Sequence, residues 1–241
     1  MHIRNFLAIT MLSTAFLAGC GGGGGGGTSP TPVSVASTAT FPFFSIAAGR
    51  FNEAKTRSFT VSLHLSTGQV LTGTGTDSSS APASSSFEGR PSLVKNFTTT
   101  YSYTNGSVSF PIFETSSAHY DSNYTLLGGI GSNYYGVVTN SFPEPQSAKI
   151  GDTGPLAIAT TYSNSTKTTI LGSSKLSYVF EPDTNSTAIL KLISENFDKT
   201  NTRQSYSTIA YRVSTDGSYT LLSDTNSYLS GELRLKTLIY Q

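Results

Sequence analysis

Histidine, serine and acidic side chains are the first candidates for catalysis. The chain contains His2, His64 and His119, 14 Asp and Glu residues, and a large number of serines. A Ser/His/Asp triad could be assembled from this set, because unrelated folds bring such residues together from distant positions. However, the Gly-x-Ser-x-Gly turn that presents the serine of many hydrolases is absent. The sequence identifies no catalytic residue, and it leaves a hydrolase or carbohydrate-active enzyme open as an alternative.

Metal and cofactor sites need ligands at suitable spacing. With one Cys and three His, the chain cannot supply the Cys₄ or Cys₂His₂ set of a structural zinc site. Residues 151–154, Gly-Asp-Thr-Gly, could place Asp152 and several carbonyls around calcium, or form a tight turn in which Asp152 bonds to the backbone. The glycine run 21–27 lacks the Gly-Lys-Ser/Thr ending of a phosphate loop. We therefore expect no metal and no cofactor.

Four tyrosines form a short, tyrosine-rich part of the sequence: Tyr120, Tyr124, Tyr134 and Tyr135. Tyrosine is rigid and amphipathic, so it suits surfaces that contact a protein or a glycan. It is also an ordinary strand residue. The sequence therefore allows two interpretations of this region, a recognition surface or the face of a sheet.

The first twenty residues have the pattern of an export signal. Arg4 gives a positive start, and residues 6–18 are mostly apolar but too short to span a bilayer. The segment ends in Leu17-Ala18-Gly19-Cys20, which resembles the lipobox of bacterial lipoproteins. The resemblance implies a signal peptide over residues 1–19, cleavage before Cys20, and acyl chains such as palmitate on the Cys20 thiol and the new amino terminus. Because Gly21 rather than Asp follows, it also implies the outer membrane.

A linker follows the lipid site. Residues 21–27 are all glycine, and Ser, Thr, Pro, Ala and Val follow up to residue 40. Such a segment has little to bury and much entropy to lose on ordering. We expect residues 20–40 to be a flexible tether, with a root-mean-square span of about 25 Å.

From residue 41 onward the pattern is that of short strands. Phe59, Val61 and Leu63 alternate with polar residues, and the pairs 105–106 and 216–217 are Asn-Gly and Asp-Gly hairpin signals. The last such run alternates Leu235, Thr237 and Ile239 with Arg234, Lys236 and Leu238. We expect an all-β fold, an antiparallel sandwich or barrel of about 12 to 15 strands. Residues 187–196 could form a strand or a short helix, and 77–86 a mobile loop.

The head is expected to cover residues 41–241. Residues 142–146, Phe-Pro-Glu-Pro-Gln, cannot continue a central strand because proline has no N–H to donate. This segment could separate two packed β sub-domains, 41–142 and 147–241.

Several segments resemble uncharacterised proteobacterial lipoproteins: residues 87–89, 120–124, 149–154, 166–169 and 178–184. That resemblance implies no activity and no catalytic residues. The glycine tether is also similar to those of surface lipoproteins whose β-barrel heads bind host proteins.

The charge and composition of the chain argue against one class of function, nucleic-acid binding. The net charge is +1 and only 12% of residues are charged, which argues against nucleic acid as a partner. We expect a lipid-anchored protein of the bacterial cell envelope that serves as a binding or structural module and is not an enzyme. Its partners would be the membrane, through its lipid, and an envelope protein or glycan. The alternatives are an envelope hydrolase or carbohydrate-active enzyme, and an accessory subunit of an outer-membrane assembly.

Overall fold

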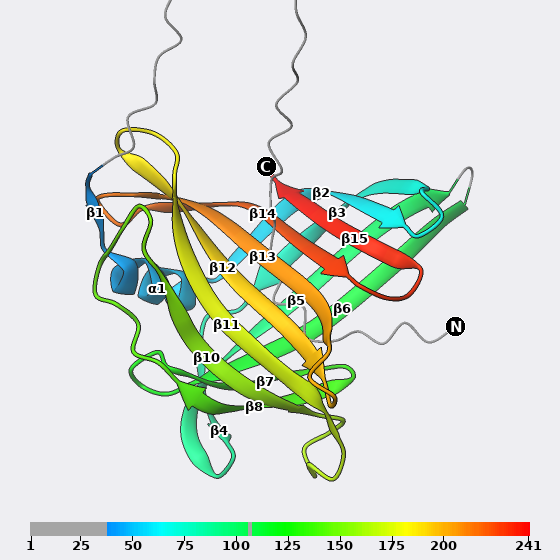
Figure 1. The fold of residues 1–241 in the computed structure, drawn as a ribbon, viewed down its shortest axis with the longest axis horizontal. Coiled ribbons are helices and arrows are strands. Elements are labelled where there is room, and N and C mark those ends of the chain that lie inside the picture. The colour runs from blue at the N-terminus through cyan, green and yellow to red at the C-terminus, as the bar shows by residue number, and fades with distance from the viewer. Residues whose placement is uncertain (1–37, 106–107) are drawn as a thin grey trace, which may run out of the picture.

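Strands make up most of the described chain, residues 38–105 and 108–241 of a computed structural model (Figure 1). The elements are β1 (Thr40–Phe41), α1 (Phe43–Asn52), β2 (Lys55–Leu65), β3 (Val70–Ser79), β4 (Ala83–Phe87), β5 (Arg90–Asn105), β6 (Val108–Tyr120), β7 (Leu126–Gly131), β8 (Tyr134–Ser141), β9 (Ala148–Lys149), β10 (Thr153–Tyr162), β11 (Ile170–Pro182), β12 (Thr187–Asp198), β13 (Arg203–Ser214), β14 (Tyr219–Tyr228) and β15 (Leu233–Tyr240). The expectation of an all-β, antiparallel fold is confirmed.

Twelve of these strands close into a barrel. Neighbouring strands pair in the order β2, β3, β5, β6, β7, β8, β10, β11, β12, β13, β14, β15, and β15 pairs with β2 again. The short strand β4 lies beside the first residues of β5 and continues the line of β3. Of the two architectures left open by the sequence, sandwich and barrel, the chain forms the barrel. β1 and β9 form a separate two-stranded sheet.

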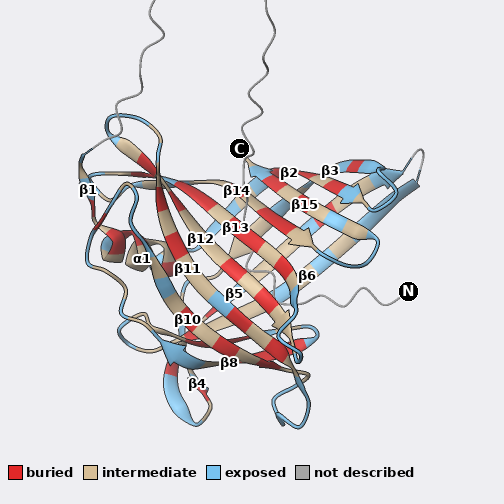
Figure 2. Ribbon diagram, in the orientation of Figure 1, coloured by how far each residue is buried: buried red, intermediate tan, exposed pale blue. Residues whose placement is uncertain are grey.

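Alternation along each strand separates the inside of the barrel from the outside. On β2, Phe59, Val61 and Leu63 are buried inside, while Thr60 and Ser62 lie outside. The ribbons in Figure 2 change between buried and exposed along the strands accordingly. A second row of inward residues from β3, β5 and β15 packs on these three side chains. The outer face is rich in Ser and Thr, whose hydroxyls remain hydrated with few charges.

The helix α1 packs inside one end of the barrel. Its Phe43 ring lies 4.8 Å from the Tyr178 ring on β11, and its Phe51 ring lies 4.7 Å from the Tyr120 ring on β6. Ile46, on the same face, is fully buried. The sequence analysis missed this helix, because ten residues give few turns for a periodic pattern and three of its four bulky residues are phenylalanines, which also favour strands.

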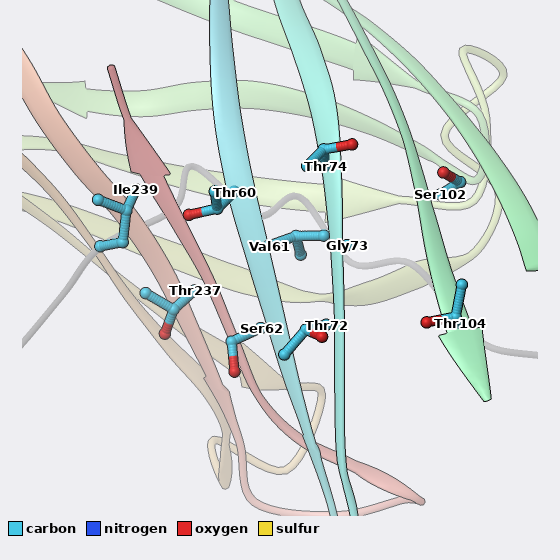
Figure 3. A pocket seen from close by; sticks show the side chains of 10 residues that line it. All are labelled: Thr60, Val61, Ser62, Thr72, Gly73, Thr74, Ser102, Thr104, Thr237 and Ile239. Atoms are coloured by element: carbon cyan, nitrogen blue, oxygen red, sulfur yellow. The ribbon is translucent and has the colours of Figure 1, made fainter. Parts of the chain in front are cut away.

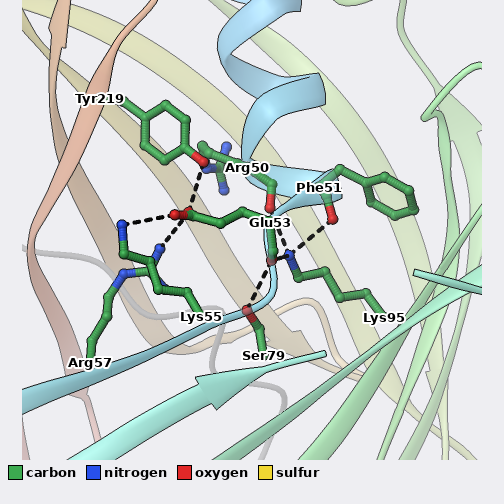
Figure 4. Close-up of polar contacts among 8 residues, drawn as sticks. All are labelled: Arg50, Phe51, Glu53, Lys55, Arg57, Ser79, Lys95 and Tyr219. Atoms are coloured by element: carbon green, nitrogen blue, oxygen red, sulfur yellow. Dashed lines mark hydrogen bonds and ion pairs between the residues drawn. The ribbon is translucent and has the colours of Figure 1, made fainter. Parts of the chain in front are cut away.

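The C-terminal end of α1 is held by a lysine from the opposite wall (Figure 4). Lys95 on β5 donates to the carbonyl oxygens of Arg50 at 2.7 Å, Phe51 at 3.0 Å and Glu53 at 2.6 Å. The first two carbonyls belong to the last turn of the helix, where backbone acceptors lack partners within the helix. The Glu53 carboxylate in turn pairs with Lys55 at 2.8 Å and accepts from the Tyr219 hydroxyl at 2.9 Å.

The two halves of the sequence belong to one closed sheet. β8 and β10, which flank the proline-containing segment 142–146, pair directly with each other. That segment is a connection running to β9, and the sub-domains 41–142 and 147–241 are therefore not separate barrels or sandwiches. The head also begins earlier than residue 41, because Thr40 pairs with Lys149 in β1 and Ala39 packs on the core. The preceding tether lies outside the described residues.

Two local expectations are settled by the strands. Residues 187–196 form part of β12, so the strand interpretation is confirmed over the helix. The prediction of a mobile loop over residues 77–86 is wrong for most of these residues. β3 extends to Ser79 and β4 begins at Ala83, so only residues 80–82 lie between strands. Ser-rich sequence forms strands here because both segments have β5 as a hydrogen-bonding partner.

Candidate ligand-binding cavity

The barrel is hollow on one side. A cavity of about 530 Å³ lies between α1 and the strand wall, within the range of about 300–1,000 Å³ typical of small-molecule sites. Small side chains create the space, since the inward positions of β6, β7, β8, β10 and β11 carry Ser116, Ala118, Gly129, Gly131, Gly136, Ala157, Ala159 and Ser174. Leu176, Leu192 and Ile209 provide the apolar part of the wall.

An ion pair crosses the barrel interior beside this cavity. Lys236 on β15 is buried, and its Nζ lies 3.2 Å from Glu114 Oε2 on β6. The Tyr101 hydroxyl donates to the other oxygen of Glu114 at 3.3 Å, and Lys236 Nζ lies 5.4 Å from the Tyr101 ring centre. Burial lowers the pKa of Lys236, but Glu114, Tyr101, Tyr228 and Asp224 together outweigh burial, and the pKa of Lys236 is raised.

Asp224 is a further charged group of the cavity wall, which also carries Arg57, Asp77 and Lys95. On the inner face of the sheet its register partners are Ile209 on β13 and Leu238 on β15, so an acidic group stands between two apolar side chains. Its Oδ1 is buried and has no hydrogen-bond partner among the described residues. Burial raises the pKa of Asp224 well above its ordinary value; Lys236 opposes this, and the charges of Asp77 and Glu114 add to it.

The end of the cavity below α1 is polar as well. The guanidinium carbon of Arg50 lies 4.3 Å from the Tyr211 ring centre, and Glu144 from the β8–β9 connection lines the same end. Burial raises the pKa of Glu144, and the charge of Arg50 opposes that shift. The cavity is therefore amphipathic, with charged groups at two places and aliphatic side chains between them.

Three of the four predicted tyrosines, Tyr120, Tyr124 and Tyr134, line the cavity, whereas Tyr135 lies on the other face of the sheet. Tyr120 and Tyr124 pack on Phe51 of α1 at ring distances of 4.7 and 5.1 Å. Tyr134 is buried and lines the cavity, and its hydroxyl has no partner within the described chain. Tyr135 is buried outside the barrel wall, stacked on Phe87 at 5.3 Å. Consecutive strand residues point to opposite faces, so Tyr134 and Tyr135 could not have shared a surface.

Neither candidate catalytic histidine lines the cavity. Ser62 Oγ lies 3.2 Å from His64 on the outer wall, and Ser92 Oγ lies 3.3 Å from His119 Nδ1 beneath Phe87. Within the described residues neither histidine has a hydrogen-bonded or ion-paired acidic partner, which a triad requires. His2 and Cys20 lie outside the described residues.

Residues 151–154 form a tight turn. Asp152 accepts from the backbone N–H of Lys149 at 2.8 Å, and Gly151 has a φ of 93°. Of the two interpretations of this segment, the turn is confirmed. Across the part of the chain that is described, no group of three or more His, Cys, Asp or Glu side chains is placed to hold a metal ion.

A second hollow, of about 510 Å³, lies on the outer wall (Figure 3). Its lining side chains are mainly the hydroxyl residues of β2, β3, β5 and β15, with Thr60, Thr72 and Thr104 among them. It contains no ionisable group, whereas the inner cavity combines charge, burial and unpartnered polar atoms. We therefore treat the inner cavity as the candidate site.

Sequence analysis missed the residues that give this site its charge. Lys236 stands in an alternating run whose other face carries Leu235 and Ile239, so the pattern gives no reason to place the lysine inside. Asp224 follows a bulge, between Ala210 and Tyr211 opposite, which shifts the alternation of β14. A signal was present in the glycine and alanine residues of 128–136 and 157–159, which mark a wall without large side chains.

No helix of the described chain is long and apolar enough to cross a membrane. Comparisons with protein-family profiles, with curated proteins and with solved structures found no match.

Proposed function

We propose that this protein is a lipid-anchored component of the bacterial cell envelope whose barrel head binds a small ligand in its interior cavity. The observation that carries the binding role is the cavity itself, about 530 Å³ of space beneath α1. A barrel core normally fills its interior with side chains, and eight-stranded barrels that hold a ligand leave such space. Maintaining a hollow lined by buried polar groups costs stability, which a ligand would offset.

The anchor is proposed from the sequence alone. Leu17-Ala18-Gly19-Cys20 supplies the site for acylation, and two or more acyl chains hold a protein on a bilayer far more firmly than one. The hydroxyl-rich outer wall suits a head that sits in water beside the bilayer, connected through residues 20–38. We place the protein at the outer membrane because Gly21 follows Cys20.

Labelling tests the anchor. Wild-type protein expressed with radioactive palmitate should incorporate label, Cys20→Ser should not, and globomycin should cause the uncleaved precursor to accumulate. Mature protein with an unmodified Cys20 thiol in mass spectrometry would contradict the anchoring proposal.

Filling the cavity tests the binding role. Ala159→Phe points into the cavity, whereas Thr160→Phe, its neighbour on β10, points outward. With the full-length protein in lipid nanodiscs, hexan-1-ol binding should weaken at least tenfold in Ala159→Phe and stay within twofold in Thr160→Phe. Equal binding to both variants would refute a site inside the barrel.

A second function, subunit of an outer-membrane assembly, is favoured by one observation. At the strand ends remote from α1 the rim carries exposed aliphatic side chains, with Val108 55%, Ile170 54% and Leu229 52% exposed. Exposed apolar groups at one end of a molecule are typical of contact surfaces. Co-purification with a membrane partner that is lost in the double variant Ile170→Ser/Leu229→Ser would support this role, and retention in that variant would contradict it.

A further inference from the structure

We infer that the cavity is built for a cationic amphiphile, a molecule whose ammonium group lies against Asp224 and whose apolar body follows β12 and β13. This inference rests on the proposed function, because it names the ligand class of the same cavity. The ligand class follows from how charges are distributed around Asp224 on the inner wall.

Asp224 is a lone carboxyl in an apolar row. Its side chain stands between Ile209 and Leu238 on the neighbouring strands, and Leu192 is the next residue across β12. Three of these four residues are aliphatic, and all four line the cavity. A ligand lying along this row would contact hydrocarbon on most of its length and one carboxyl at a single place.

The cations near Asp224 already have anionic partners. Lys236 is held by Glu114 at 3.2 and 3.4 Å, and Arg57 on β2 pairs with Glu53 at 3.0 Å. Asp77 on β3 adds a further negative group, which accepts from the Thr99 hydroxyl at 3.2 Å. The ionisable groups that act on Asp224 from the surrounding strands are therefore Lys236, Asp77, Glu114, Tyr228 and Tyr240. Counting Asp224 itself, this group holds three carboxyls and one lysine, and that lysine is already held by Glu114. Arg57 and Lys95 also line the cavity, and their charges act on Asp77.

An ammonium group would complete this arrangement. It would donate to the carboxyl whose Oδ1 lacks a partner, and it would reduce the repulsion among Asp224, Asp77 and Glu114. An anion placed there would meet the same three carboxyls, and the Lys236 ammonium is already held by Glu114. The phenol rings of Tyr228 and Tyr240 lie on the same and the adjacent strand, and aromatic faces attract cations as well.

Proton release should accompany binding. Burial, with Asp77 and Glu114 adding to it against Lys236, raises the pKa of Asp224, and a bound ammonium favours the ionised carboxylate. The affinity for an amine should therefore rise with pH until the amine itself loses its proton. The affinity for an uncharged ligand of the same length should not change.

Calorimetry on the full-length protein in nanodiscs tests the inference, with hexylamine, hexan-1-ol and hexanoate as probes and empty nanodiscs subtracted. Hexylamine should bind at least tenfold more tightly than hexan-1-ol at pH 7.5, hexanoate more weakly than either, and two buffers of different ionisation enthalpy should reveal proton release. Each further methylene of the amine should tighten binding about fourfold while space remains.

Asp224→Asn isolates the charge, and Asp216→Asn in the exposed β13–β14 turn is the matched control. In Asp224→Asn the dissociation constant of hexylamine should come within threefold of that of hexan-1-ol. The affinity for hexan-1-ol should stay unchanged, which also shows that the cavity remains intact. The second should leave both affinities unchanged.

Two failures can be told apart. If hexan-1-ol binds inside the barrel but hexylamine is no tighter, or keeps its advantage in Asp224→Asn, the cationic preference is wrong and the binding proposal stands. If none of the three probes binds, the proposed function fails together with the inference.

Discussion

Replacing Lys95 by methionine should release the C-terminal end of α1. Methionine keeps a long apolar stem but removes the ammonium that bonds to three carbonyl oxygens, those of Arg50, Phe51 and Glu53. Lys95 exposes 4% of its surface, so little water is at hand to replace it. The substitution therefore separates the fixing of the helix from its apolar packing, which stays in place.

The expected cost follows from two opposing effects. The Arg50 and Phe51 carbonyls lose the lysine as a partner, whereas the Glu53 carbonyl still accepts from the Ser79 hydroxyl at 3.4 Å. A carbonyl left without a partner in a buried place costs about 1–3 kcal/mol, so two cost about 4 kcal/mol. Burial, with the charges of Arg50 and Arg57 nearby, lowers the pKa of Lys95 to about 8. Discounted for partial screening by solvent, the removed charge offsets about 2 kcal/mol of this cost. The net loss is about 2 kcal/mol, or about 4–8 °C in Tm for a domain of this size.

Denaturant unfolding and hydrogen exchange measure this loss. Lys199→Met, in an exposed turn, is the matched control and should change stability by less than about 0.5 kcal/mol. In Lys95→Met the amides of α1 should exchange faster than those of β12, because the helix end is no longer fixed.

The pH dependence gives a further check. Between pH 8 and about 10.5 the unfolded chain binds more protons at Lys95 than the folded chain, so wild-type stability gains from rising pH. The gap between wild type and variant should widen by up to about 2 kcal/mol between pH 8 and 9.5. A stability of Lys95→Met equal to that of Lys199→Met, with unchanged exchange in α1, would refute the role assigned to Lys95.

Three other substitutions test separate parts of the molecule. Asp224→Asn should be more stable than wild type at pH 7, and the difference should vanish below about pH 4, because the stability contributed by an acid with a raised pKa is lost as pH rises above the ordinary pKa of an aspartate; urea unfolding at both pH values measures it. Burial lowers the pKa of His119, so wild-type stability should fall as pH drops from 7 to 5.5, and His119→Gln should lack this fall when both are unfolded in urea at the two pH values. Gly73→Ala should destabilise the barrel by about 2–3 kcal/mol, since its Cβ would lie 1.8 Å from the Ser102 carbonyl oxygen, and a Tm within 2 °C of wild type would contradict that close approach.

Strands were predictable here because alternation and turn chemistry agree. Phe59, Val61 and Leu63 are inward as their spacing predicts, and the Asp-Gly pair at 216–217 forms the β13–β14 turn with Gly217 at a φ of 88°. The Asn-Gly signal is supported by the pairing of Asn105 with Val108, although residues 106–107 lie outside the described chain. Local patterns of this kind depend only on neighbouring residues, so they can be interpreted without knowledge of the whole fold.

The cavity was not predictable because it depends on distant residues. Glu114 and Lys236 meet across the barrel although 122 positions separate them in the sequence. A one-residue bulge determines whether the Asp224 side chain points into the barrel or out of it, and the local sequence pattern does not indicate this bulge. Of the four predicted tyrosines, Tyr120, Tyr124 and Tyr134 line the cavity, and strand alternation places Tyr135 on the outer face. Charge inside a barrel is thus set by closure and register, which only the assembled sheet determines.

The joint between β2 and β15 has a consequence for biosynthesis. The ring closes only when residues 233–240 pair with residues 59–65, so an amino-terminal fragment cannot complete it. A truncated chain that lacks β15 leaves the edges of β2 and β14 unpaired, and unpaired strand edges are templates for aggregation. Premature termination near the carboxyl terminus should therefore be as damaging as loss of the first strand, and degradation by proteases should remove such fragments quickly.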